Sequence, residues 1–231
     1  MKYLFRLLLA LASWIPAHLA FSQSQFAVGL SGGLNLATQD YELQSGLFDI
    51  DYDWAIQYRT GVHAEWRFAR RFLLGLEGAY AQKGNQDNDI EYTDENGNTI
   101  AGAKARSVFR YFEQATLLKY RFFSQKIRPY TMLGTSVGYL TGGKTKAFNI
   151  KVDGIDQTTF EQDLPLDDYN RTDFALLGGG GVEITAGKRG FLFAEARYQH
   201  GLTDILKSEP VALRNRNLSF TAGYAFLFGV K

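Results

Sequence analysis

Apolar and polar residues alternate one by one in eight segments of the chain. In the first segment Phe26, Val28 and Leu30 take one face, while Ala27 and Gly29 take the other. A period of two is the pattern of a β-strand whose two faces have different surroundings. The eight segments are residues 26–36, 58–68, 72–83, 112–122, 131–139, 174–184, 192–198 and 218–228. The sequence therefore predicts an all-β fold of eight strands.

The charged residues of these segments share the face that also carries the small residues. A membrane barrel turns its apolar face to lipid and encloses its polar face, whereas a soluble barrel does the reverse. A Lys or Arg facing lipid near the midplane costs roughly 2 to 4 kcal/mol, so the charged face must point inward. The predicted interior charges, which we interpret as structural, are Arg59, Glu65, Arg67, Glu77, Lys83, Glu113, Lys119, Arg121, Glu183, Glu195 and Arg197.

Backbone groups at an open sheet edge find no hydrogen-bond partner in lipid, so the sheet must close on itself. The prediction is an eight-stranded antiparallel up-and-down transmembrane β-barrel. A barrel of this size has an interior just wide enough for its own side chains. We therefore favour a packed polar interior over a pore or a proton path.

The links between segments alternate between long and short. Residues 38–57, 84–111, 142–171 and 201–216 are long, and residues 69–71, 123–128 and 186–190 are short. Outer-membrane barrels have short periplasmic turns and longer outer loops, so both termini are expected to be periplasmic. Two aromatic girdles are predicted, with Tyr58, Tyr80, Tyr139 and Tyr198 on the outer side and Trp66, Phe72, Tyr120 and Phe228 on the inner.

The first 22 residues have the pattern of a cleaved export signal. Lys2 and Arg6 supply charge, residues 7–15 form a short apolar run, and Ala20 and Ser22 offer small residues for cleavage. Residues 23–231 are then the barrel domain. The chain has no Cys, which excludes disulfides, thiolate metal sites and a lipoprotein anchor.

Several residues are chemical candidates, and none carries a recognisable motif. His63 is interpreted as a packed interior residue rather than a pH switch. His200 would need a serine and a carboxylate to act as a catalytic base. Ser208, Glu209 and Ser219 lie nearby in sequence, but no nucleophile motif surrounds them. The sequence predicts no catalytic residue and no enzyme.

The long links are rich in acidic residues. Asp49, Asp51 and Asp53 resemble part of a calcium loop, but the Gly and the distal Glu of that loop are missing. We expect a solvated acidic surface, no metal site and no cofactor. Asn96-Gly97 is typical of a hairpin tip, which predicts that residues 84–111 extend the strands beyond the membrane. No basic patch or phosphate loop indicates a nucleic-acid partner.

Four sequence motifs carry a resemblance to the PorT-like outer-membrane β-barrel family, over essentially the whole mature chain. They are Gly32-Gly33-Leu34-Asn35, Leu117-Leu118-Lys119-Tyr120, Arg128-Pro129-Tyr130 and the run from Arg197 to Ile205. The resemblance implies the barrel fold. The family's namesake is tied to protein secretion across the outer membrane.

The sequence thus predicts a non-enzymatic, integral outer-membrane barrel. It would bind a partner through its outer loops or periplasmic rim, or stabilise the envelope. Three alternatives stay open: a component of a secretion complex, by family analogy, a small-solute channel, or a lipid-modifying enzyme. The expected surroundings are outer-membrane lipid and lipopolysaccharide, with a monomeric barrel and a protein partner in the envelope.

Overall fold

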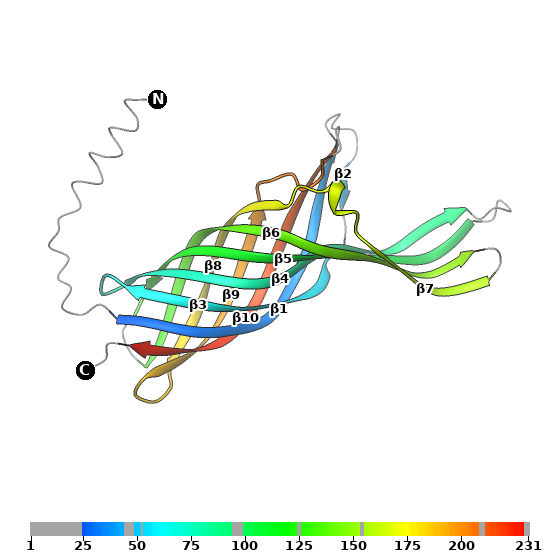
Figure 1. The fold of residues 1–231 in the computed structure, drawn as a ribbon. Coiled ribbons are helices and arrows are strands. Elements are labelled where there is room, and N and C mark those ends of the chain that lie inside the picture. The colour runs from blue at the N-terminus through cyan, green and yellow to red at the C-terminus, as the bar shows by residue number, and fades with distance from the viewer. Residues whose placement is uncertain are drawn as a thin grey trace, which may run out of the picture.

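Eight long strands form a closed antiparallel barrel in the computed structural model (Figure 1). The structure describes residues 25–43, 49–51, 53–93, 99–123, 126–152, 155–207 and 211–228. The barrel strands are β1 (Gln25–Leu43), β3 (Ala55–Arg67), β4 (Phe72–Thr93), β5 (Thr99–Arg121), β6 (Ile127–Val152), β8 (Thr172–Thr185), β9 (Gly190–Gly201) and β10 (Val211–Phe228). Each pairs with its neighbour in sequence, and β10 closes the ring on β1. The predicted fold class is confirmed.

The alternation along each strand separates an apolar outer face from a polar inner face. Leu30 and Leu133 on the outer face are 67% and 69% exposed, whereas Glu183 and Asp173 on the inner face are fully buried. Inward glycines make room for larger side chains of neighbouring strands. A Cβ on Gly29, for example, would collide with the ring of His63. The pairing of large and small residues lets an eight-stranded barrel fill completely.

Aromatic side chains ring the barrel near both ends of its outer face. At one end Tyr58, Tyr80 and Phe112 follow one another across β3, β4 and β5, with ring centroids 5.8 and 6.1 Å apart. At the other end Phe72 contacts Tyr120 at 5.2 Å. In β3, Tyr58 of one girdle and Trp66 of the other are eight residues apart. At about 3.3 Å per residue and a tilt of about 40°, this spacing gives an apolar band of about 20 Å.

The sheet continues far past the barrel at one end (Figure 1). The link 84–111 is mostly strand, as predicted, because β4 and β5 stay paired out to Thr93 and Thr99. Its Asn96-Gly97 tip lies outside the described residues. The prediction of a loop at 142–171 is wrong: β6 continues to Val152 and pairs with β7 (Ile155–Asp163). This part of β6 lies outside the apolar band, so its outward positions carry charged residues. The apolar alternation that predicts a membrane strand therefore stops there.

The other long links are shorter than predicted. β1 continues to Leu43 and pairs with the short strand β2 (Asp49–Asp51), and β10 begins at Val211. Residues after β7 form a 3-10 turn (Leu166–Asp168) that folds over the barrel mouth. There the backbone N–H of Asn170 donates to the carbonyl of Ile205, and its side-chain amide donates to the carbonyl of Asp204.

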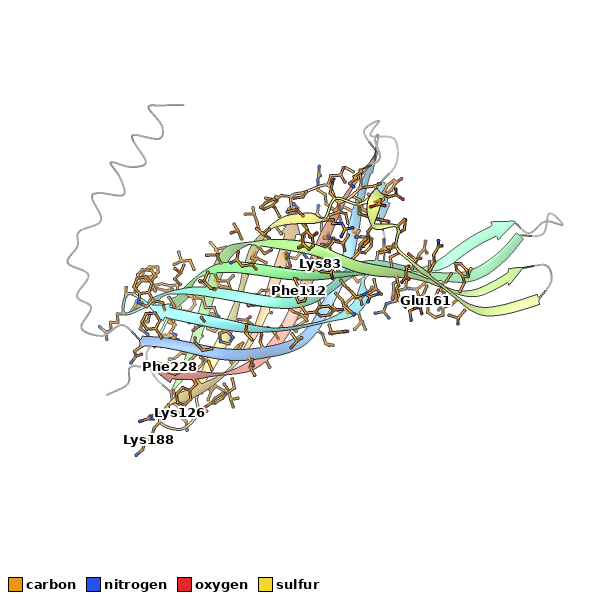
Figure 2. The ribbon with its side chains drawn as sticks, in the orientation of Figure 1. Lys83, Phe112, Lys126, Glu161, Lys188 and Phe228 are labelled. Atoms are coloured by element: carbon orange, nitrogen blue, oxygen red, sulfur yellow. The ribbon has the colours of Figure 1, made fainter. Side chains whose placement is uncertain are left out.

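Both ends of the described chain lie at the barrel end opposite the extended sheet. Figure 2 places Phe228 near Lys126 and Lys188, which stand in the short links, and Glu161 of β7 at the far side. Among the described residues, no helix is long and apolar enough to cross a membrane. The predicted export signal at residues 1–22 lies outside the described residues and stays a prediction.

Candidate functional site

The barrel interior holds a single continuous chain of ion pairs in which acidic and basic groups alternate. It begins with Asp173, which pairs with Lys83; the Nζ of Lys83 lies 2.9 Å from carboxylate oxygens of both Asp173 and Glu113. Arg59 joins Glu113, at 2.7 Å, to Glu77. In order the members are Asp173, Lys83, Glu113, Arg59, Glu77, Arg197, Glu195, Lys119, Glu65, Arg121, Glu183 and Arg128. We call this set the ion chain.

The second half of the ion chain continues toward the end with the short links. Arg197 pairs with both Glu77, at 2.7 Å, and Glu195. Lys119 lies 2.6 Å from Glu65 and 3.6 Å from Glu195. The last ion pairs are those of Arg121 and Arg128, which share Glu183 at 2.6 and 3.2 Å. Each carboxylate therefore has a cation beside it, as burial of charge requires.

Neutral side chains complete the network. Gln199 donates to Glu113 at 3.0 Å, and Tyr130 donates its hydroxyl proton to Glu195 at 2.6 Å. Asn215 donates to Asp173 at 2.9 Å. Each of these donors bonds to a carboxylate oxygen that a lysine also approaches, so it adds a hydrogen bond to a buried charge and reduces the cost of burying it.

The lumen is closed at both ends of the ion chain by apolar clusters. Phe109, Tyr111 and Ile205 belong to the cluster at the mouth, which Leu166 and Tyr169 cover. Phe191 and Phe193 pack with small residues nearer the short links. The cavity beside the middle of the ion chain has a volume of only about 10 Å³. That is room for about one water molecule, not a path for solutes.

The structure places ten of the eleven predicted interior charges in the ion chain. Arg67 is the exception, because it precedes the short link and its half-buried side chain reaches the rim. Asp173 and Arg128 were missed by sequence reasoning. Asp173 directly precedes the predicted segment 174–184, whereas Arg128 stands in the predicted short link, three residues before the segment 131–139. Both are at inward positions, so extending the alternation of β8 and β6 by a few residues would have found them.

The two candidate histidines lie on opposite faces of the barrel wall. His63 is buried against the edge of the Phe193 ring, at 4.8 Å between centroids. His200 points outward, with Nδ1 3.1 Å from Arg216. Ser219 is buried inside, where its hydroxyl faces the Arg197 carbonyl. His200 and Ser219 therefore cannot form a catalytic pair; Ser208 and Glu209 lie outside the described residues.

No metal site is found in the part of the chain that the structure describes, where no three His, Cys, Asp or Glu residues converge. Asp53 is exposed and accepts a hydrogen bond from Asn88 at 2.7 Å. The side chains of Asp49 and Asp51 are not among those described.

A groove of about 520 Å³ opens on the outer face, where the extended sheet leaves the barrel. We call it the basic groove. Four basic side chains line it, together with one carboxylate, three aromatic rings and three further residues: Arg106, Arg110, Lys144, Lys146, Glu161, Tyr58, Tyr80, Phe148, Gln57, Gln82 and Val108. The residues come from β3, β4, β5, β6 and β7, so only the tertiary structure assembles this site.

Glu161 is the one acidic residue in the lining of the basic groove. Its carboxylate accepts a hydrogen bond from Lys144 and lies 2.8 Å from Lys146. These two lysines lower the pKa of Glu161 to about 2. Arg106 donates to the backbone carbonyl of Ile56, which ties β5 to the end of β3. Among the described residues Arg110 makes no ion pair.

A family model described as the outer membrane protein beta-barrel domain matches residues 21–207. The chain belongs to this family. Its membership, together with the closed barrel and the apolar outer band, places the protein in the outer membrane. No curated protein matches the chain.

Several solved outer-membrane barrels are similar to this chain at low sequence identity. Neisserial surface protein A is 17% identical, with 88% of this chain and 97% of that chain covered and a TM-score of 0.44. The N-terminal barrel domain of Pseudomonas aeruginosa OprF is 14% identical, with 89% and 100% covered and a TM-score of 0.43. The Escherichia coli outer membrane protease OmpT is 10% identical, with 88% and 97% covered and a TM-score of 0.41.

Proposed function

We propose that this protein is a closed, non-enzymatic, monomeric anchor that displays a β-sheet at the cell surface for binding. The observation that carries the proposal is the contrast between a filled lumen and a long extension. β6 runs about 13 residues past Tyr139, which amounts to about 40 Å of extended strand. An extension of this length has no role in closing the barrel. Rigid scaffolds that project connecting segments commonly use them for recognition.

The orientation is part of this proposal. The short links carry basic residues, among them Lys126 and Lys188, and lie beside the described chain ends (Figure 2). Short turns face the periplasm in outer-membrane barrels. The sheet of β4, β5, β6 and β7 then stands outside the cell.

The test removes the extension and keeps the barrel. The strands can be shortened at paired positions, because Asn85 pairs with Ser107 and Lys144 pairs with Asp163. Replacing residues 86–106 and 145–162 by Asn-Gly turns should leave a barrel that inserts and shifts on a gel when heated. A cell-surface binding or envelope phenotype of a deletion strain should then return with the full chain and not with the shortened one. Full rescue by the shortened barrel contradicts the proposal.

The filled lumen argues against a small-solute channel. Purified protein in planar bilayers should give no conductance above that of protein-free bilayers. The opposite placement of His200 and Ser219 argues against a lipid-modifying enzyme. Lipid A and phospholipid profiles should therefore be the same with and without the gene.

We also propose that the chain is PorT-like within its family, with the four sequence motifs as support. A role in a secretion complex rests on that analogy alone. A lysine-reactive crosslinker in intact cells tests it, because Lys126 and Lys188 stand at the proposed periplasmic rim. A stoichiometric periplasmic partner on these lysines would favour the secretion role. Recovery of the barrel as an uncrosslinked monomer would remove it.

A further inference from the structure

We infer that the basic groove binds the phosphorylated head group of lipopolysaccharide in the outer leaflet, with the acyl chains running down the barrel wall. The inference uses the proposed outward orientation of the extended sheet. It does not depend on what the sheet itself binds. It assigns a ligand of stated chemistry to a site on the side of the barrel.

The height of the groove is the first argument. Tyr58 and Tyr80 line it and also belong to the aromatic girdle next to the extension. Aromatic girdles mark the level where hydrocarbon meets the head groups. A groove that begins at this girdle and opens outward therefore lies among lipid head groups, not in bulk solvent.

The charge of the groove is the second argument. Four cations line it against the single carboxylate of Glu161, and Asp163, which lies across from Lys144 in β7, adds a second negative charge at its edge, so two positive charges remain uncompensated. Lys144 and Lys146 share that carboxylate, and among the described residues Arg110 pairs with none. A phosphate accepts two parallel hydrogen bonds from a guanidinium and a point contact from each lysine. The groove thus has the donor set of a phosphate site.

The walls below the groove favour an amphiphile over free phosphate. Val108 and Phe148 give the groove an apolar side. Phe112, directly below in β5, is 63% exposed on the outer face, and Leu76 beneath the girdle is 52% exposed. A head group held at Arg110 would have its acyl chains against these residues. An inorganic ion would gain nothing from them.

The pairing register of β5 and β6 explains why the cations are on the outward face. Lys144 and Lys146 of β6 pair across from Val108 and Arg106 of β5, so their side chains project to one side. The adjacent inward positions, such as Phe109, are buried. Four cations on one side of a sheet repel each other unless anions lie among them, and Glu161 and Asp163 together supply only two negative charges.

The experiment measures binding of phosphorylated lipid A to the full-length mature barrel in detergent by native mass spectrometry. Three proteins are compared: the wild type, Arg110→Gln, and Arg106→Gln/Arg110→Gln. We expect binding about 5-fold weaker for the single variant and about 30-fold weaker for the double variant. Arg70→Gln/Arg71→Gln is the matched control, because it removes two exposed cations from a short link at the opposite end.

Glu161→Gln should change the affinity for lipid A in the opposite direction. It removes the carboxylate that occupies Lys144 and Lys146, so binding should become several-fold tighter than in the wild type. A gel shift on heating reports folding for every variant. Because Arg110 has no ion pair among the described residues, Arg110→Gln is expected to fold even where the double variant does not.

Three results would overturn the inference. One is equal binding of lipid A before and after enzymatic removal of its phosphates. Another is an Arg110→Gln variant that binds as the wild type does. The third is displacement of lipid A by an equal concentration of inorganic phosphate, which would mean a free-anion site. None of these results bears on the bilayer and shortened-barrel tests above, so the two proposals fail separately.

Discussion

Replacing Lys83 by methionine tests whether the ion chain stabilises the barrel. Lys83 is 1% exposed, and its ammonium group lies 2.9 Å from both Glu113 and Asp173. It also sits 4.9 Å from the centre of the Tyr111 ring. Methionine has a similar length and is apolar, so the substitution removes the charge with little change in volume.

The loss of stability depends on which partners the carboxylates of Glu113 and Asp173 keep once Lys83 is replaced. Glu113 retains Arg59 at 2.7 Å and Gln199 at 3.0 Å. Asp173 retains only the Asn215 amide, at 2.9 Å, and its Oδ1 has no partner among the described residues. Removing one member of a buried pair typically costs about 3 to 5 kcal/mol. We expect the lower figure, about 3 kcal/mol, because Glu113 stays paired.

A second substitution separates the charge effect from packing. In Lys83→Met/Asp173→Asn the unpaired carboxylate becomes an amide, and the rest of the ion chain stays neutral. Replacing a buried pair by neutral groups of similar volume is often close to neutral in stability. The double variant should return to within about 1 kcal/mol of the wild type.

Urea unfolding in detergent micelles measures both variants, with the fluorescence of Trp54 and Trp66 and gel mobility as independent signals. Trp66 lies in the girdle and stacks on Phe26. A Lys83→Met barrel as stable as the wild type would refute the stabilising role of the ion chain. A double variant no more stable than Lys83→Met would show that the loss came from packing.

Other predictions follow from the same geometry. Leu30→Arg, in mid-band, should destabilise the barrel by about 2 to 4 kcal/mol, and Phe112→Arg, at the girdle, by about 0 to 1 kcal/mol; equal losses in vesicle unfolding would contradict the membrane placement. The depressed pKa of Glu161 makes its ion pairs a source of stability above its ordinary pKa of 4.5, lost as the pH falls toward 2. An NMR titration should give its midpoint near 2, and a midpoint near 4.5 would exclude the ion pairs in solution. Gly84 has φ +131°, so Gly84→Ala should cost about 1 to 3 kcal/mol in urea unfolding, whereas Gly78→Ala, at an open outward position, should cost less.

The alternation of residues was enough to predict the barrel and the inward face of its charges. A charge that faces lipid is so costly that one register is allowed and the opposite one excluded. This is a local property of each strand, and therefore it can be read from sequence. Glu65 and Arg197, for example, are separated by 132 positions but are each assigned to the interior by their own neighbours.

Only the tertiary structure decided which charges pair and what lies beyond the barrel. Lys83 meets Asp173 because the registers of β4, β5, β6 and β8 bring them together, and alternation carries no information on register between strands. The extension of β6 and β7 was missed for a related reason. Outside the lipid both sheet faces meet water, so the period of two loses its apolar signature. The basic groove draws on five strands, and its residues become neighbours only when those strands are in place.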